Sequence, residues 1–516
     1  MSDRTPLKTD TLASGIAMLL ALTVAQRLIG FARGVLFCRW LDSDQLGQWD
    51  LAYGFLMLAA PLAVLGLPGS LGRYAEYYRQ RGSIKRFLRQ VVTGTAFVAG
   101  LSVAIVVWRR DWFAEALFSR SDQADFVSVL AIVLATWIFH TLLVALFNAL
   151  RMTRVVSALQ FCHSLGFAVI GVGLLFCGQA SAAGVLWSFA GASALSSTLG
   201  IVWLANSWSR LPELPPDSDG TRWDLWKQIL PFALWVWITN ALANTFGLAD
   251  RWMIIHFSGL SEPEALAQLG QYHSARIVPI LFLGIAEMFA GLVTPHLAYD
   301  WEGGRREQVA RRLNFILKSF SLCLFAASAA LLVASPLLFG VALAGKYATG
   351  MALLPWTLMY CIWGSLAVVA TNYLWCAERA KLACLSILLG LIINVALGAW
   401  LLPRYGLHGA AWGTSVANFA ILGALHIAAW TCGMRFDRGV FLAALAPLAL
   451  LAGPGAALSV LFLFAVLAWR TSWLLTADEQ RHLIETLRHF TRRFIKNKAT
   501  ALQHEDQHVR PNTAIG

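Results

Sequence analysis

Residues 45–52 read QLGQWDLA, and residues 268–275 read QLGQYHSA. Five of the eight positions are identical, at an offset of 223 residues. Two shorter echoes have similar offsets: GFAR at 30–33 resembles GLAD at 247–250, and GVLW at 184–187 resembles GAAW at 409–412. We infer a duplicated unit of roughly 220 residues, which is too long for a solenoid repeat and is typical of the two halves of a transporter.

The composition is that of a membrane protein. Hydrophobic residues make up 58% of the 516 residues and charged residues only 13%, against about 25% in soluble domains. The eight cysteines lie in or beside apolar stretches and form no CxxC pair, which argues against a metal site or a disulfide framework. We expect no cleavable signal peptide, because the first apolar stretch is long and contains arginines.

The apolar stretches predict an all-α, multi-pass membrane protein with about fourteen transmembrane helices. A spanning helix needs about 20 predominantly apolar residues. The expected spans are 12–36, 46–67, 87–108, 126–150, 155–177, 183–206, 228–257, 269–297, 313–341, 350–375, 382–402, 408–431, 437–453 and 455–474. The first twelve spans form two repeated six-helix bundles, and the last two lie outside the repeat.

One clear linker, LPELPPDSDG at 211–220, divides the halves, because its prolines and acids neither continue a helix nor lie in lipid. The predicted units are an N-terminal six-helix bundle, a cytoplasmic linker, a C-terminal six-helix bundle, helices 13–14 and a basic cytoplasmic tail. They cover residues 1–210, 211–226, 227–434, 435–475 and 476–516. The tail sequence LIETLRHFTRRFIKNK at 483–498 suits either a helix on the anionic inner leaflet or a solvated tail.

The basic residues set the expected orientation. Most lysines and arginines fall in segments that are cytoplasmic when both termini are cytoplasmic, and an even number of spans fits this arrangement. The net charge of +12 therefore reflects membrane topology and does not indicate nucleic acid as a partner.

Charged residues inside the expected spans are the candidate functional residues. Arginines occur in the first, seventh and eighth spans, and each costs roughly 2.5–3.5 kcal/mol near the centre of a span. Acidic residues accompany them in the second, seventh and eighth spans. The arginines are Arg27, Arg33, Arg251 and Arg276, and the acids are Asp50, Asp250 and Glu287.

Two interpretations of these charges are open. The arginines could line a water-filled cavity between the halves that binds an anionic group, because the planar guanidinium suits phosphate. Alternatively, they could extend to the outer surface or form Arg–Asp pairs that lock helices together. Asp250 and Arg251 are adjacent on a helix and point about 100° apart, so we expect them to have different partners.

Other chemistry is weakly indicated. Five histidines are candidates either for proton carriers or for packing residues: His140, His163, His256, His273 and His296. The sequence has no catalytic constellation, no P-loop and no large extramembrane domain, so we expect neither an enzyme nor a resident cofactor.

Three segments resemble the polysaccharide transporter family, the Wzx-type flippases of O-antigen and exopolysaccharide. They are AQRLIGFARGVLFCRWLDSDQLGQWDLAYGF at 25–55, LPFALWVWITNALANTFGLADRWMI at 230–254 followed by LGQYHSA at 269–275, and LPRYGLHGAAWGTSVAN at 402–418. The resemblance covers about residues 10–435 in pattern. The wider superfamily includes the lipid II flippases and the multidrug and toxin extruders, and helices 13–14 favour the lipid-linked branch.

The resemblance implies two bundles around a central cavity, alternating access, and a location in the bacterial inner membrane. It implies that an undecaprenyl-pyrophosphate-linked glycan is carried among membrane lipids, with a polysaccharide polymerase and glycosyltransferases as partners. Arg27, Arg33, Arg251 and Arg276 would bind the pyrophosphate. The second span carries Asp50 where relatives have an arginine. H⁺ or Na⁺ would be the coupling ion, with Asp50, Asp250 or Glu287 as its site.

Two other functions stay open at this point. A cation-coupled exporter of small drugs would favour an acidic cavity, which the four arginines oppose. A membrane-embedded glycosyltransferase or ligase would need a large extramembrane domain with carboxylates.

Overall fold

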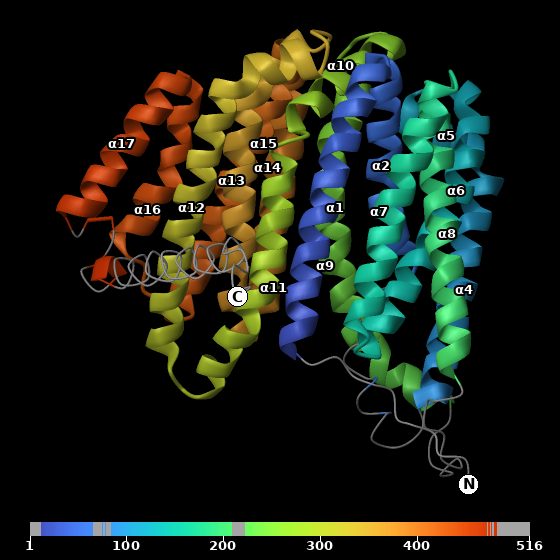
Figure 1. Cartoon of the computed structure of the whole chain (residues 1–516), viewed down its shortest axis with the longest axis horizontal. Helices are drawn as coiled ribbons and strands as arrows, with labels where there is room; N and C mark the ends of the chain where they lie inside the picture. The colour runs from blue at the N-terminus through green and yellow to red at the C-terminus, as the bar shows by residue number, and fades with distance from the viewer. Residues whose placement is uncertain are drawn as a thin grey trace, which may run out of the picture.

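The computed structural model describes residues 12–64, 75, 78, 84–208, 222–471, 473, 474, 476 and 479–481. Within these residues the chain forms helices and no strands (Figure 1). Nine helices of this described part are long and apolar enough to span a membrane. The prediction of an all-α multi-pass membrane protein is confirmed, whereas the count of fourteen spans stays a prediction.

Within the described residues, the first half contains six long helices and one short one. The short helix α5 lies in what the sequence predicted to be a connection. The elements are α1 (Leu12–Trp40), α2 (Ser43–Ala63), α4 (Ile84–Trp108), α5 (Arg110–Phe118), α6 (Ala124–Ala149), α7 (Thr153–Phe176) and α8 (Ala182–Trp208).

The second half repeats this order, with one expected span divided in two. Its elements are α9 (Arg222–Phe257), α10 (Glu262–Arg276), α11 (Ile280–Glu302), α12 (Arg306–Leu337), α13 (Ala348–Cys376), α14 (Ala380–Tyr405) and α15 (Leu407–Thr431). A last helix pair follows: α16 (Arg438–Leu445), which continues as a 3-10 helix over Ala446–Ala452, and α17 (Pro454–Arg470).

Each half contains the same pairs of packed helices. α1 packs against α7, as α9 packs against α14. α7 packs against α8, as α14 packs against α15, and α6 contacts α8, as α13 contacts α15. The duplicated sequence therefore folds into two similar bundles. They meet mainly where α2 packs against α9 and α10, near the centre of Figure 1.

The expected span at 269–297 is interrupted, because a turn over 277–279 separates α10 from α11. Pro279 has no backbone N–H and precedes the first residue of α11, and the amides of Leu281 and Phe282 bond to carbonyl groups three residues earlier. Arg276 consequently becomes the last residue of α10 and lies at a helix end inside the protein.

The helix pair α16–α17 lies at one edge of the molecule, where it packs against α12 (Figure 1). The proposed linker at 211–220 and most of the proposed tail at 476–516 lie outside the described residues, so the unit boundaries stay predictions.

Candidate functional site

The repeated sequence string forms the contact between the two halves. Gly47 of α2 lies so close to α10 that an added Cβ atom would be 1.9 Å from the carbonyl oxygen of Leu266. Gly270, its equivalent on α10, lies just as close to α2, where a Cβ atom would be 1.9 Å from the carbonyl oxygen of Ser43. Glycine lets the two helix backbones approach to this distance. The two copies of the string therefore pack reciprocally against each other.

Polar contacts between the halves close the same end of the molecule. α10 begins there with a capping arrangement, in which the Ser261 amide donates to the Glu264 side chain at 3.2 Å. The cross-half contacts join Arg120 to Glu262 at 2.7 Å, the Tyr347 hydroxyl to the Cys38 carbonyl at 2.9 Å, and the Trp252 indole to the Ala116 carbonyl at 2.8 Å. Lys346 lies 3.7 Å from Asp42. These contacts join the two halves at the end where α10 begins, at the top of Figure 1.

A buried ion pair crosses the interface just inside this closed end. Arg251 of α9 donates from Nε to Asp50 of α2 at 2.8 Å, and the Nδ1 of His273 on α10 lies 2.7 Å from the other oxygen of Asp50. Asp50 and Arg251 are both buried. Gly54 makes room for this pair, because a Cβ atom there would lie 3.1 Å from Cδ of Arg251. One carboxylate of the first half thus binds two side chains of the second.

Asp250 points away from this pair, as its position beside Arg251 predicted. Its carboxylate accepts hydrogen bonds from the Tyr272 hydroxyl and from the Asn394 amide, both at 2.9 Å. Tyr272 also lies 3.2 Å from the hydroxyl of Tyr360. The Oδ1 atom of Asn394 is buried and has no hydrogen-bond partner among the described residues. The second half therefore holds a buried carboxylate beside an unused amide oxygen.

Arg276 differs from Arg251 because two of its guanidinium donors lack acceptors among the described residues. Its Nε and Nη1 atoms are buried, and neither has a hydrogen-bond partner in the part of the chain that the structure describes. The guanidinium carbon lies 5.2 Å from the ring centre of Tyr272. A buried guanidinium with unpaired donors is costly, so this position is suited to an anion that supplies the missing acceptors.

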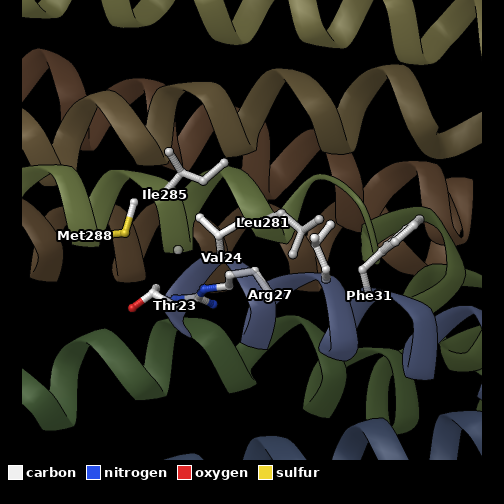
Figure 2. A pocket seen from close by; sticks show the side chains of 9 residues that line it. Thr23, Val24, Arg27, Phe31, Leu281, Ile285 and Met288 are labelled. Atoms are coloured by element: carbon white, nitrogen blue, oxygen red, sulfur yellow. The ribbon is translucent and has the colours of Figure 1, made fainter. Parts of the chain in front are cut away.

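Arg33 and Arg27 lie on α1 in different surroundings. The Arg33 guanidinium is stacked 4.0 Å from the ring centre of Phe167, in the first half. Arg27 reaches across to α11, where its guanidinium occupies the space that a side chain at Gly284 would need. There it borders a cavity of about 230 Å³ between α1 and α11, which is otherwise lined mostly by apolar side chains (Figure 2).

Among the described residues, the remaining candidates make no hydrogen bond or ion pair with these arginines. Glu287 is exposed on α11 and makes no hydrogen bond or ion pair with any described residue. His140 and His163 stack on each other at 4.8 Å within an aromatic cluster of the first half. His256 is stacked on Trp252.

Sequence reasoning missed the role of Tyr272 and of the two glycines. The signal was present in the repeated string itself, since Gly47 and Gly270 occupy the same position in its two copies. Asn394 of α14 forms an interhelical hydrogen bond with Asp250 of α9.

A family model described as "Polysaccharide biosynthesis protein" matches residues 12–298 of the chain. A sequence search of curated proteins finds no significant match.

Solved structures of similar fold cover most of the chain. The structure described as "Lipid II flippase MurJ, inward closed conformation" has a TM-score of 0.67 and 13% identity, covering 88% of this chain and 99% of that one. An inward-facing multidrug resistance MATE family transporter of the MOP superfamily has a TM-score of 0.57 and 12% identity, covering 81% and 98%. An outward-facing one has 0.56 and 12%, covering 80% and 94%. At these identities the likeness concerns the fold.

Proposed function

The chain belongs to the polysaccharide biosynthesis protein family, and from this premise we propose that it is a flippase for lipid-linked oligosaccharides. Its substrate would be a glycan on an undecaprenyl-pyrophosphate carrier, moved across the bacterial inner membrane by alternating access. The observation that carries the proposal is Arg276, a half-buried arginine at a helix break, whose buried Nε and Nη1 donors have no partner among the described residues. No bond of the substrate is made or broken.

The substrate headgroup supplies what Arg276 lacks. A pyrophosphate diester carries two negative charges and several acceptor oxygens, and guanidinium groups bind such oxygens in pairs. Arg251 is already paired with Asp50, so it is less available to an anion in this closed state. Arg276 is therefore the primary phosphate ligand of the proposal, and Arg33 and Arg27 are secondary ones.

The cavity beside Arg27 suits the point at which a lipid phosphate enters. Its lining by Val24, Leu28, Phe31 and Leu281 is apolar, and Arg27 borders it through the aliphatic part of its side chain (Figure 2). The hydrocarbon chain of a lipid fits such a cavity, because apolar walls match its apolar surface, and its phosphate would lie outside the cavity beside the Arg27 guanidinium.

Opening toward the periplasm would require the α2–α10 contact to separate. That separation breaks the pairing of Asp50 with Arg251 and His273. An anion that reaches Arg251 competes with Asp50 for the guanidinium, and so weakens the bond that holds the halves together. Binding and opening are coupled in this way through differential affinity for two states.

We propose Na⁺ as the coupling ion, bound at Asp250. Hard cations prefer oxygen ligands, and the Asp250 carboxylate lies beside the unused Oδ1 of Asn394. A proton on Asp50 is the second candidate, because it would release Arg251. Glycosyltransferases that build the glycan and a polymerase that extends it are the expected partners, with both termini of the chain in the cytoplasm.

Reconstitution in proteoliposomes tests the function. A labelled undecaprenyl-pyrophosphate oligosaccharide is added, and its exposure on the far leaflet is followed. We expect Arg276→Gln to lower binding about 10- to 100-fold, since hydrogen bonds to charged groups contribute roughly 1.5–3 kcal/mol. Arg404→Gln is the matched control, because Arg404 is exposed and, among the described residues, its guanidinium contacts Trp400 of its own helix.

Three outcomes separate the alternatives. Movement that fails with Arg276→Gln and persists with Arg404→Gln supports the flippase and its phosphate ligand. Movement that survives Arg276→Gln keeps the function and rejects the ligand. No movement with a range of glycans and ion gradients, together with drug resistance in an expressing host, would instead support a multidrug exporter.

A further inference from the structure

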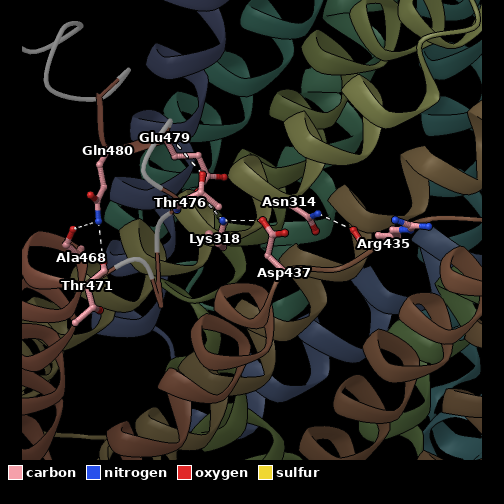
Figure 3. Close-up of polar contacts among 9 residues, drawn as sticks. All are labelled: Asn314, Lys318, Arg435, Asp437, Ala468, Thr471, Thr476, Glu479 and Gln480. Atoms are coloured by element: carbon pink, nitrogen blue, oxygen red, sulfur yellow. Dashed lines mark hydrogen bonds and ion pairs between the residues drawn. The ribbon is translucent and has the colours of Figure 1, made fainter.

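A fully buried lysine, Lys318, lies in the N-terminal half of α12, away from the arginines of the candidate site. Lys318 has no exposed side-chain surface. Its Nζ donates to Asp437 at 3.0 Å and to Glu479 at 2.6 Å (Figure 3). The sequence separations are 119 and 161 residues, so this one ammonium joins α12 to the start of α16 and to the chain after α17.

The same face of α12 makes two further hydrogen bonds, one to the connection before α16 and one to α16 itself. The Asn314 amide donates to the Arg435 carbonyl at 2.8 Å, and the Ser321 hydroxyl to the Ala443 carbonyl at 2.7 Å. Asn314, Lys318 and Ser321 are four and three residues apart, which places them on one side of the helix. α12 thus presents a polar stripe that fits the helix pair.

The chain beyond α17 folds back to complete this contact. The Gln480 amide donates to the carbonyls of Ala468 and Thr471 at the end of α17, at 2.9 and 2.8 Å (Figure 3). Glu479 also accepts from the Thr476 backbone amide at 2.8 Å. Gly439 lies against this segment, because a Cβ atom there would be 2.2 Å from the Leu474 carbonyl oxygen.

We propose that Lys318, Asp437 and Glu479 form a latch that fixes α16 and α17 to the second half as one rigid body. The latch joins both ends of the helix pair to α12, so the pair must follow α12 in any movement of the halves. In the transport cycle, a statement that rests on the proposed function, the pair would keep its place on the second half while the α2–α10 contact opens.

The charges explain why the latch holds and how it can be released. A buried ammonium is stable only with acceptors of opposite charge, and both carboxylates depend on the same ammonium. In Lys318→Met the two carboxylates face each other without a cation, and they repel. Neutralising all three groups, in Lys318→Met with Asp437→Asn and Glu479→Gln, removes this repulsion.

The test measures the distance between α12 and α17 by pulsed electron paramagnetic resonance in lipid nanodiscs. Spin labels replace the exposed residues Glu307 and Arg470, after the exposed Cys177 and Cys323 are changed to serine. We expect one narrow distance distribution in the otherwise unchanged protein. Lys318→Met should broaden it, Glu479→Gln should broaden it less, and the triple neutral variant should be narrower than Lys318→Met.

Trypsin cleavage after Arg470 and Arg481 gives a second measurement, because a released segment exposes its backbone. We expect cleavage on the order of tenfold faster in Lys318→Met than in the unchanged protein, an effect that is reduced because Asp437 is partly exposed. A variant that fails to fold is recognised by cleavage throughout the chain, and the triple neutral variant then decides the matter.

Two results would overturn the proposal. One is an unchanged distance distribution in Lys318→Met together with unchanged cleavage. The other is a change in the α12–α17 distance when Gly47→Ala separates the halves, since the latch requires that distance to stay constant. Neither measurement needs a substrate, so a protein that fails to move lipid-linked glycan would reject the flippase and leave the latch standing.

Discussion

Replacing Gly47 with alanine should open the end of the molecule that α2 and α10 hold shut. The new Cβ atom would lie 1.9 Å from the Leu266 carbonyl oxygen, 2.9 Å from its carbon and 3.0 Å from the Gly270 nitrogen. All three atoms belong to the backbone of α10, so no side chain can rotate to relieve the contact. The helices would have to separate by about 1.5 Å to restore ordinary van der Waals distances.

The size of the effect follows from the cost of overpacking. Inserting a methyl group into a well-packed contact costs about 1–3 kcal/mol. If that cost falls on the closed state alone, the ratio of closed to open molecules decreases roughly 5- to 150-fold. Gly270→Ala should act in the same way, because its Cβ atom would meet the Ser43 carbonyl oxygen at 1.9 Å. The double variant should cost less than the two single costs together, because one separation relieves both contacts.

Distance measurements between spin labels at Asp42 and Leu260, which are exposed on either side of the contact, report the separation. We expect a longer distance to be populated in Gly47→Ala and in Gly270→Ala. Gly100→Ala is the control, since a Cβ atom there has nothing within 4 Å. An unchanged distance in both variants, or the same change in Gly100→Ala, would refute the reasoning.

Three further predictions concern the buried charges. Arg251→Ala should abolish transport while the protein still inserts. It should lower the free energy of unfolding by about 3–5 kcal/mol, because Asp50 loses its main buried partner. With Asp50→Asn added, the melting temperature should partly recover, and no recovery would contradict the pairing. Gly54→Ala should displace Arg251, because its Cβ atom would lie 2.9 Å from Cδ1 of Leu248 and 3.1 Å from Cδ of Arg251. Transport should therefore fall while expression is kept, and normal transport would show that Arg251 tolerates displacement. Asp250→Asn should remove the Na⁺ dependence of transport in proteoliposomes, and an unaltered dependence would place the coupling ion elsewhere.

The sequence by itself determined the class of the protein and its division into halves. Apolar stretches of about 20 residues can satisfy their backbone groups in lipid only as helices. The string at 45–52 and 268–275 identified the duplication, because equivalent contacts in two halves require the same residues. Even the different partners of Asp250 and Arg251 followed from the geometry of a single helix. The apolar stretches and the helix geometry are local properties of the chain, and the duplication follows from comparing two short strings without knowing how they pack.

Only the tertiary structure decided what each arginine does. In the sequence Arg27, Arg33, Arg251 and Arg276 looked equivalent, as positive charges in expected spans. In the folded chain Arg251 binds Asp50, 201 residues away, whereas Arg276 keeps two buried donors unpaired. The sequence likewise gave no signal that Lys318 would bind two carboxylates from distant parts of the chain. The physical reason is that a partner depends on where distant helices cross, and those crossings are set by packing between residues far apart in the chain.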